Sequence, residues 1–271
     1  MNYLTISILS ILSFFIIINQ VVIGIRVGSG IYDITGPSVE INFMGYAVPG
    51  QRGSGIHQRL RARSYIIEND DERVVFVSID CGMASDLVKT YVVNYLNDKL
   101  SSNIYNNDNI MISGTHTHSG PAGFLQYVLF QVTSLGFVHE TFDSLVTGIS
   151  ESILKAHYNL QQSNVYINQG KLYNTNINRS PTSYLLNPQE ERDQYIDGDT
   201  DKTMLLMKFT NELTNEPIGV INWFAVHGTS MNNTNTLVSG DNKGYASYLL
   251  EREINGAPSE TGIQTGLGDF V

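Results

Sequence analysis

The 271-residue chain lacks several features that define common protein classes. Cys81 is its only cysteine, which excludes a disulfide scaffold, an iron–sulfur site and a cysteine-based zinc finger within one chain. Cys81 follows an apolar run, so we expect it to be a buried, small apolar side chain. Basic residues are few and form no run: 16 Lys and Arg stand against 26 Asp and Glu, a net charge of -10. We therefore expect no nucleic-acid partner, because such proteins cluster Lys and Arg against phosphates.

Long apolar runs are also scarce, and the exception lies at the N-terminus. Residues 4–18 (LTISILSILSFFIII) carry no charge, and the small residue Gly24 follows at a point suited to cleavage. The run is short for a transmembrane helix, which needs about 20 apolar residues. We expect residues 1–24 to be a signal peptide and the protein to be secreted. The alternative is an uncleaved signal that anchors the chain in a membrane, because Met1–Tyr3 lacks Lys and Arg.

Beyond residue 25 the chain has the composition of a folded protein, and its pattern predicts an α/β fold. Hydrophobic residues make up 42% and charged residues 15% of the sequence. A strand at 74–79, a helix capped by Ser85 or Asp86 and a strand at 109–113 predict a βαβ unit with parallel strands. Further helices are expected at 140–158 and 243–254, and strands at 165–168, 204–209 and 218–226. The prediction is a mixed, partly parallel sheet flanked by helices, without a clear domain boundary.

Two other stretches look irregular. Residues 26–59 are rich in glycine, which indicates loops and turns broken by short strands. Residues 174–201 form a long polar stretch with few apolar anchors, and a loop of that length is usually functional or mobile.

Three histidines directly follow two predicted strands. His116 and His118 come after the strand at 109–113, and His227 comes after the strand at 218–226. Ligands bind beyond the carboxyl ends of strands in open sheets, and two adjacent strands would bring these imidazoles together. Neutral imidazole is a good zinc ligand, so a zinc site is one interpretation. Ordinary hydrogen-bonded histidines are the other, and His139 and His157 on or beside the predicted helix are read as non-functional.

Two further polar residues have a structural and a functional interpretation. Arg179 lies in the polar stretch and could clamp substrate oxygens, or it could be an ordinary surface residue. Asp241 precedes the last predicted helix, and helix capping is the simpler role for it. Asn178 and Asn232 begin the sequons NRS and NNT, which are candidate glycosylation sites if the protein is secreted.

Several motifs occur together in one order along residues 26–271. They are INFMGYAVPGQ at 41–51, VSIDCGM at 77–83, SGTHTHSGPAG at 113–123, INRSP at 177–181, NWFAVH at 222–227, SMNN at 230–233 and GYASYLLE at 244–251. In combination they resemble the neutral ceramidase family, and THTHSGP is suggestive even by itself. The resemblance implies a secreted or membrane-associated zinc amidohydrolase that cleaves the amide of ceramide into sphingosine and a fatty acid. We therefore expect ceramide and a membrane surface as partners.

The resemblance also assigns roles to individual residues. It implies that His116 and His227 are zinc ligands, that His118 is a second active-site histidine beside the metal, and that Arg179 contacts the substrate. Because ceramide is very apolar, a deep hydrophobic pocket beside the metal is expected.

The sequence departs from the family pattern in one large respect. The family's GDVSPN motif with its serine, its later glutamate and tyrosine zinc ligands, and its C-terminal β-sandwich do not occur in the chain. Two histidines make an incomplete zinc site. We therefore interpret residues 25–271 as a partial, truncated catalytic domain that is inactive alone. The alternative is a secreted, non-catalytic ceramidase-like protein that binds lipid or a partner.

Overall fold

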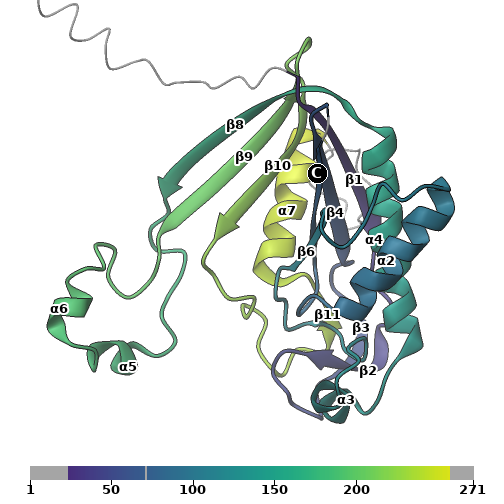
Figure 1. Ribbon diagram of the computed structural model, residues 1–271. Coiled ribbons are helices and arrows are strands. Elements are labelled where there is room, and N and C mark those ends of the chain that lie inside the picture. Colours follow the sequence, from purple (N-terminus) through teal and green to yellow (C-terminus); the bar gives the residue numbers. More distant parts are fainter. Residues whose placement is uncertain (1–23, 71, 257–271) are drawn as a thin grey trace, which may run out of the picture.

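The computed structural model describes residues 24–70 and 72–256 (Figure 1). The predicted signal peptide at 1–24 therefore lies outside the described residues except for Gly24. Among the helices of the described residues, none has the length and apolar character needed to cross a membrane.

One sheet of seven strands organises the chain, in the order β10-β9-β8-β1-β4-β5-β6. Within this sheet of the described chain, β5 and β6 are parallel and the other neighbouring strands are antiparallel. The bounds are β1 Arg26–Asp33, β4 Arg61–Glu68, β5 Arg73–Ile79, β6 Ile110–Gly114, β8 Gln161–Lys171, β9 Thr203–Asn211 and β10 Pro217–Phe224. The predicted α/β fold with a mixed, partly parallel sheet flanked by helices is thereby confirmed.

The predicted βαβ unit is confirmed as β5, α2 (Asp86–Leu100) and β6. Ser85 is the N-cap of α2, and its Oγ accepts a hydrogen bond from the backbone N–H of Val88 at 3.3 Å. The unit matters for function because it fixes where β6 ends and the segment with His116 and His118 begins.

The predicted helix at 140–158 is α4 (His139–Tyr158), which packs closely on β1. A Cβ atom at Gly28 would lie 1.9 Å from the carbonyl oxygen of Ala156, and one at Gly30 would lie 2.2 Å from that of Ser152. Glycine is needed at both positions because the helix backbone occupies the space of a side chain.

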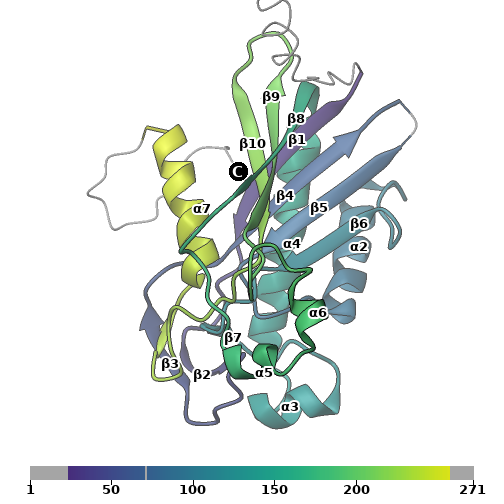
Figure 2. The same ribbon diagram turned by 90° about the vertical axis from the view of Figure 1, so that its left-hand side faces the viewer.

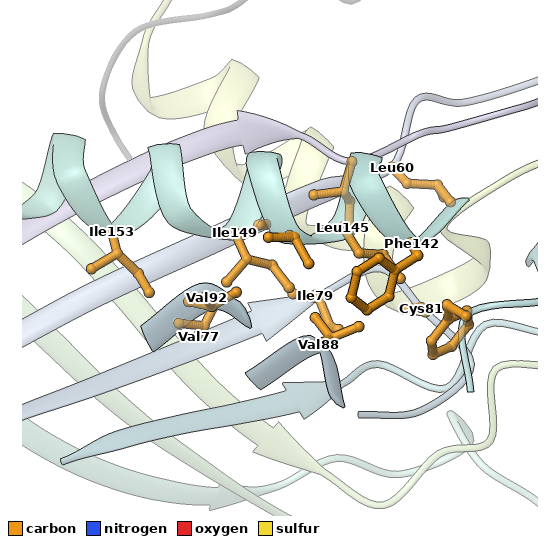
Figure 3. Packing of buried hydrophobic residues seen from close by; sticks show 14 of the residues in the cluster. Leu60, Val77, Ile79, Cys81, Val88, Val92, Phe142, Leu145, Ile149 and Ile153 are labelled. Atoms are coloured by element: carbon orange, nitrogen blue, oxygen red, sulfur yellow. The ribbon is translucent and has the colours of Figure 1, made fainter. Parts of the chain in front are cut away.

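The buried face of α4 forms the main hydrophobic core together with α2 and the strands beneath (Figure 3). Its side chains Phe142, Leu145, Ile149 and Ile153 face Val88 and Val92 of α2 and Val77 and Ile79 of β5. Cys81 belongs to the same core, as predicted, and burial raises the pKa of its thiol to about 12.

The sequence did not predict β4, a central strand of the large sheet. Its alternate residues face opposite sides: the Ser64 hydroxyl lies 2.6 Å from that of Ser152 on α4, whereas Arg63 contacts α7 (Asp241–Ile254) through Glu251. Arg63 also pairs with Asp80 at 2.9 Å. The two ion pairs stabilise the buried Arg63 side chain, and neither carboxylate is a close neighbour of Arg63 in the sequence. Helix α7 therefore lies on the side of β4 that faces away from α4.

The large sheet curls, so that β8, β9 and β10 turn away from the other strands (Figures 1 and 2). Between β1 and β8 the structure has two paired residue positions. The Tyr65 hydroxyl of β4 donates to the carbonyl oxygen of Val220 on β10 at 2.8 Å. Val27, Tyr65, Phe209, Ile218 and Ile221 form a small second core on the inside of the curl.

The remaining elements surround the end of the large sheet where the histidines lie. A second sheet has the order β11-β3-β2-β7, with bounds β2 Val39–Met44, β3 Arg52–Ile56, β7 Gly120–Pro121 and β11 Leu237–Val238. The short helix α3 (Val128–Ser134) precedes α4. The polar stretch predicted as a loop is an arm between β8 and β9, and contains α5 (Pro181–Leu185) and α6 (Gln189–Arg192).

Candidate functional site

His116, His118 and His227 come together, but not for the reason predicted. The expectation that β6 and β10 are adjacent strands is wrong, since they form opposite edges of the large sheet. The curl of the sheet brings their carboxyl ends together instead. Thr117 and Gly228 form a parallel β-bridge between the two loops, and the His118 N–H donates to the Gly228 carbonyl at 3.2 Å.

The two loops approach so closely that only glycine fits at one position. A Cβ atom at Gly228 would lie 2.3 Å from the carbonyl oxygen of His116. His116 itself has a φ of 67°, a left-handed conformation that is uncommon for residues other than glycine. Such backbone strain costs on the order of 1–3 kcal/mol and is typical of functional sites.

The three imidazoles converge on one point through their Nε2 atoms. His118 Nε2 lies 3.1 Å from His116 Nε2 and 3.0 Å from His227 Nε2. Zn–N bonds are roughly 2.0–2.1 Å long, so two nitrogens of a tetrahedral zinc site lie about 3.4 Å apart. The observed spacing is close to that value, and the three residues form a group able to hold a metal ion. The donor set therefore fits zinc.

Local contacts orient these imidazoles and lower the pKa of two of them. His116 Nδ1 donates a hydrogen bond to the carbonyl oxygen of Gly82 at 2.5 Å, which leaves Nε2 facing the ring of His118. Burial, together with the charges of His116 and His227, lowers the pKa of His118 to about 4. Burial also lowers the pKa of His227. Neutral imidazoles are the form that binds a metal ion.

Gly45 and Tyr46, in the turn between β2 and β3, pack against the ring of His118. The Tyr46 ring packs edge-on against the His118 ring with centroids 4.5 Å apart. A Cβ atom at Gly45, whose φ is 127°, would lie 2.3 Å from that ring. Neither residue was predicted as part of the site. The signal was present in the motif MGY, but nothing in the sequence indicates that this turn meets the histidine loop.

The other residues singled out in the sequence lie on the arm, in surface loops and on α4. Arg179 is an exposed residue of the arm, and its charge lowers the pKa of both His118 and His227. It is therefore within electrostatic reach of the cluster. Asn178 and Asn232 both lie in surface loops. His157 lies on α4 and shares a hydrogen bond of 2.9 Å with the Tyr105 hydroxyl, which fits its interpretation as non-functional.

The prediction that Asp241 caps the last helix is wrong. The N-cap of α7 is Gly240, and Asp241 is the first helical residue. Its carboxylate accepts hydrogen bonds from the backbone N–H groups of Ser230 at 3.0 Å and Met231 at 2.9 Å, in the loop that follows His227.

A hollow of about 720 Å³ lies on the inner face of the curled sheet. Apolar side chains from four strands line its wall, namely Tyr65, Phe76, Leu205 and Trp223. It extends to Ser230 and Asn242, which lie beside the loop of His227. The hollow therefore reaches the loop that follows His227, and Arg63, Asp201 and Lys243 add charged groups to its lining.

Comparison with known proteins supplies the family. The family described as "Neutral/alkaline non-lysosomal ceramidase, N-terminal" matches residues 25–270. Neutral ceramidase B of Dictyostelium discoideum is 49% identical over 91% of this chain and 33% of its own length. Neutral ceramidase 1 of Arabidopsis thaliana is 50% identical over 83% of this chain and 29% of its own length.

A solved structure agrees with these matches. The crystal structure of neutral ceramidase from Pseudomonas aeruginosa has a TM-score of 0.80 and 38% identity, over 92% of this chain and 38% of that one. The chain thus spans about a third of the length of the relatives it matches. A match over nearly all described residues, in sequence and in fold, shows that the chain belongs to the neutral ceramidase family.

Proposed function

We propose that this chain carries the histidine part of a zinc-dependent site that hydrolyses the amide bond of ceramide. His116 and His227 are the proposed zinc ligands, and His118 is the proposed proton-transfer residue. The observation that carries the proposal is the convergence of the three Nε2 atoms, with separations of 3.0 and 3.1 Å from His118. Membership of the ceramidase family supports ceramide as the substrate.

The chemistry needs a stronger electrophile and a nucleophile, because an amide carbonyl is unreactive. A bound zinc ion polarises a carbonyl group and lowers the pKa of its bound water towards about 7. His118 is neutral and buried, so its Nε2 can accept a proton in the transition state and return it to the leaving amine. Arg179 would bind substrate oxygen and stabilise developing negative charge. The hollow that reaches the loop after His227 has apolar side chains in its wall, which offer a place for hydrocarbon.

The chain alone is proposed to be inactive towards ceramide. If His118 moves protons, two imidazoles remain as ligands, whereas catalytic zinc sites usually have three protein ligands. Asp241 is near but is a poor candidate, because its oxygens accept backbone N–H groups of Ser230 and Met231. Such a chain would still bind zinc and could bind lipid without turnover, which is the alternative function.

The test measures zinc binding and ceramide hydrolysis separately in the 271-residue chain. We expect His116→Ala and His227→Ala to weaken zinc binding by about 100-fold or more, because losing an outer-shell partner already costs about 10- to 100-fold. The exposed His139 on α4 supplies the control His139→Ala, which should bind zinc normally.

Each readout decides a different part of the proposal. Equal zinc affinity in all variants would refute the metal site. A loss in His118→Ala as large as in His116→Ala would make His118 a third ligand. Fatty acid released by the chain alone, and lost in His116→Ala, would refute the proposed inactivity.

Secretion is proposed on the N-terminal apolar run, with residues 1–24 as a cleaved signal peptide. Expression in a eukaryotic secretory host should yield protein in the medium that begins near residue 25, with sugar on Asn232 or Asn178 that a glycosidase removes. Full-length protein retained on membranes would favour the alternative of an uncleaved anchor and membrane-surface association.

A further inference from the structure

Asp241 stands out as a buried charge in an unfavourable backbone conformation. Its exposed fraction is 3%, and its φ of 55° is left-handed. A conformation of this kind persists only where surrounding contacts determine it. Here the carboxylate accepts three backbone N–H groups, from Ser230 at 3.0 Å, Met231 at 2.9 Å and Asn242 at 2.6 Å. Hydrogen bonds to an ionised group are the strong ones, so Asp241 holds residues 230–231 firmly.

Asn242, the residue after Asp241, binds the backbone of the candidate metal ligand His227. The Asn242 side-chain amide donates to the carbonyl oxygen of His227 at 2.8 Å and to the Ser230 hydroxyl at 3.1 Å. Residues 241–242 therefore hold both ends of the loop at residues 227–231. The start of α7 fixes the segment from which the His227 imidazole projects.

The same loop reaches His118 through Tyr46. The Tyr46 hydroxyl donates to the carbonyl oxygen of Met231 at 2.8 Å, and its ring packs against His118. Asp241 binds the N–H of Met231, whose carbonyl binds Tyr46, whose ring faces His118. One buried carboxylate is thus linked to the positions of two of the three imidazoles.

We infer that Asp241 is a positioning residue for the candidate zinc site, which holds His227 through Asn242 and the loop at residues 230–231, and His118 through Met231 and Tyr46. This inference rests on the proposed function in one respect, namely that the ligand is a metal ion. The carboxylate orders the imidazoles before the ion binds, so that little ordering is left to oppose binding. Asp241 is not itself a ligand, because backbone N–H groups occupy its oxygens.

The test is Asp241→Asn in the 271-residue chain, with Asp33→Asn as the matched control. Asparagine has the same shape but replaces one acceptor oxygen by a donor, which faces a backbone N–H. Asp33 is partly buried and, like Asp241, accepts a backbone N–H, from Thr35 at 2.8 Å, but its ion pairs are with Arg59 and Arg61. We expect zinc affinity to fall about 10- to 100-fold in Asp241→Asn and to stay within two-fold in Asp33→Asn, by titration at fixed pH.

Cobalt replaces zinc to separate positioning from ligation. If Asp241 only positions, the cobalt-loaded variant keeps the coordination number of the unsubstituted chain, which the intensity of its visible absorption bands reports, and only the affinity falls. A changed coordination number would make Asp241 a ligand and overturn the inference. So would a zinc affinity within two-fold of the unsubstituted chain.

If the chain binds no zinc, the proposed function is refuted, but the inference about Asp241 can still be tested by NMR without metal. The ring resonances of His118 and His227 in the metal-free chain should shift in Asp241→Asn, while those of His139 and His157 should not. Tyr46→Phe, which removes only the hydroxyl, should shift His118 as well. If His118 and His227 keep their resonances in Asp241→Asn, the inference is wrong.

Discussion

The two parts of the large sheet differ in how they are stabilised. β4, β5 and β6 contribute to the main core under α2 and α4, whereas β8, β9 and β10 pair mainly with one another and pack on the small second core, to which β1 and β4 add Val27 and Tyr65. His116 and His118 follow β6 in the densely packed part, while His227 follows β10 in the sparsely packed part. The site therefore forms across the boundary between the two parts of the sheet, and its geometry depends on the contacts that join them.

The largest expected effect tests the difference in packing with one type of substitution. Ile149→Ala should lower the free energy of unfolding by about 4 kcal/mol, because Ile149 is fully buried in the main core. Ile221→Ala should lower it by about 2 kcal/mol, because the second core is small and its neighbours can relax. Urea denaturation measures both, with Ile167→Ala on β8 as the exposed control. Equal losses at Ile149 and Ile221 would remove the distinction between the two parts.

The second prediction disturbs the contact between the loops that follow β6 and β10. Gly228→Ala places a Cβ atom 2.3 Å from the His116 carbonyl oxygen, so the two loops must separate. We expect a loss of about 2 kcal/mol in unfolding free energy and weaker zinc binding. Gly50→Ala is the control, because a Cβ atom there has no neighbour within 4 Å. Normal zinc binding in Gly228→Ala would show that the bridge does not set the site geometry.

The third prediction concerns an aromatic contact between the two parts. Phe76 of β5 and Trp223 of β10 have ring centroids 5.8 Å apart. A double-mutant cycle with leucine at each position should give a coupling of about 1 kcal/mol, and the double variant should bind zinc more weakly. The pair Tyr91 and Phe142 joins α2 to α4 within the dense part, with centroids 5.1 Å apart. Its cycle should show similar coupling without any change in zinc binding.

The smallest effect is a pH dependence inside the dense part. Burial lowers the pKa of His157 below its ordinary value of 6.5, so the unfolded chain binds the proton more tightly. The stability that neutral His157 contributes is therefore present above about pH 6.5 and lost as the pH falls below it. Between pH 7.5 and 5.5, Tm should fall less in His157→Gln than in the unsubstituted chain. His139→Gln, an exposed position on the same helix, should behave like the unsubstituted chain; a smaller fall there would contradict the assignment.

Local sequence signals predicted the elements whose burial follows a simple period. β5, α2, β6 and α4 were all expected close to their observed bounds, because apolar residues recur at strand or helix spacing and Ser85 marks a helix start. β4 was missed because Arg61, Arg63 and Glu68 interrupt its apolar pattern. Arg63 is acceptable inside the protein only through Asp80 and Glu251, and no local pattern reveals partners so distant in sequence.

The sequence by itself determined which three histidines were expected to come together, because each follows the end of a predicted strand. Only the tertiary structure decided how they meet. β6 and β10 are opposite edges of one sheet. Their ends meet because the sheet curls, because Thr117 and Gly228 form a bridge, and because Asp241 accepts hydrogen bonds from the loop after His227. The physical reason is that helix capping and hydrophobic periodicity depend on residues a few positions apart, whereas curl and burial are set by packing and hydrogen bonds between residues far apart in the chain.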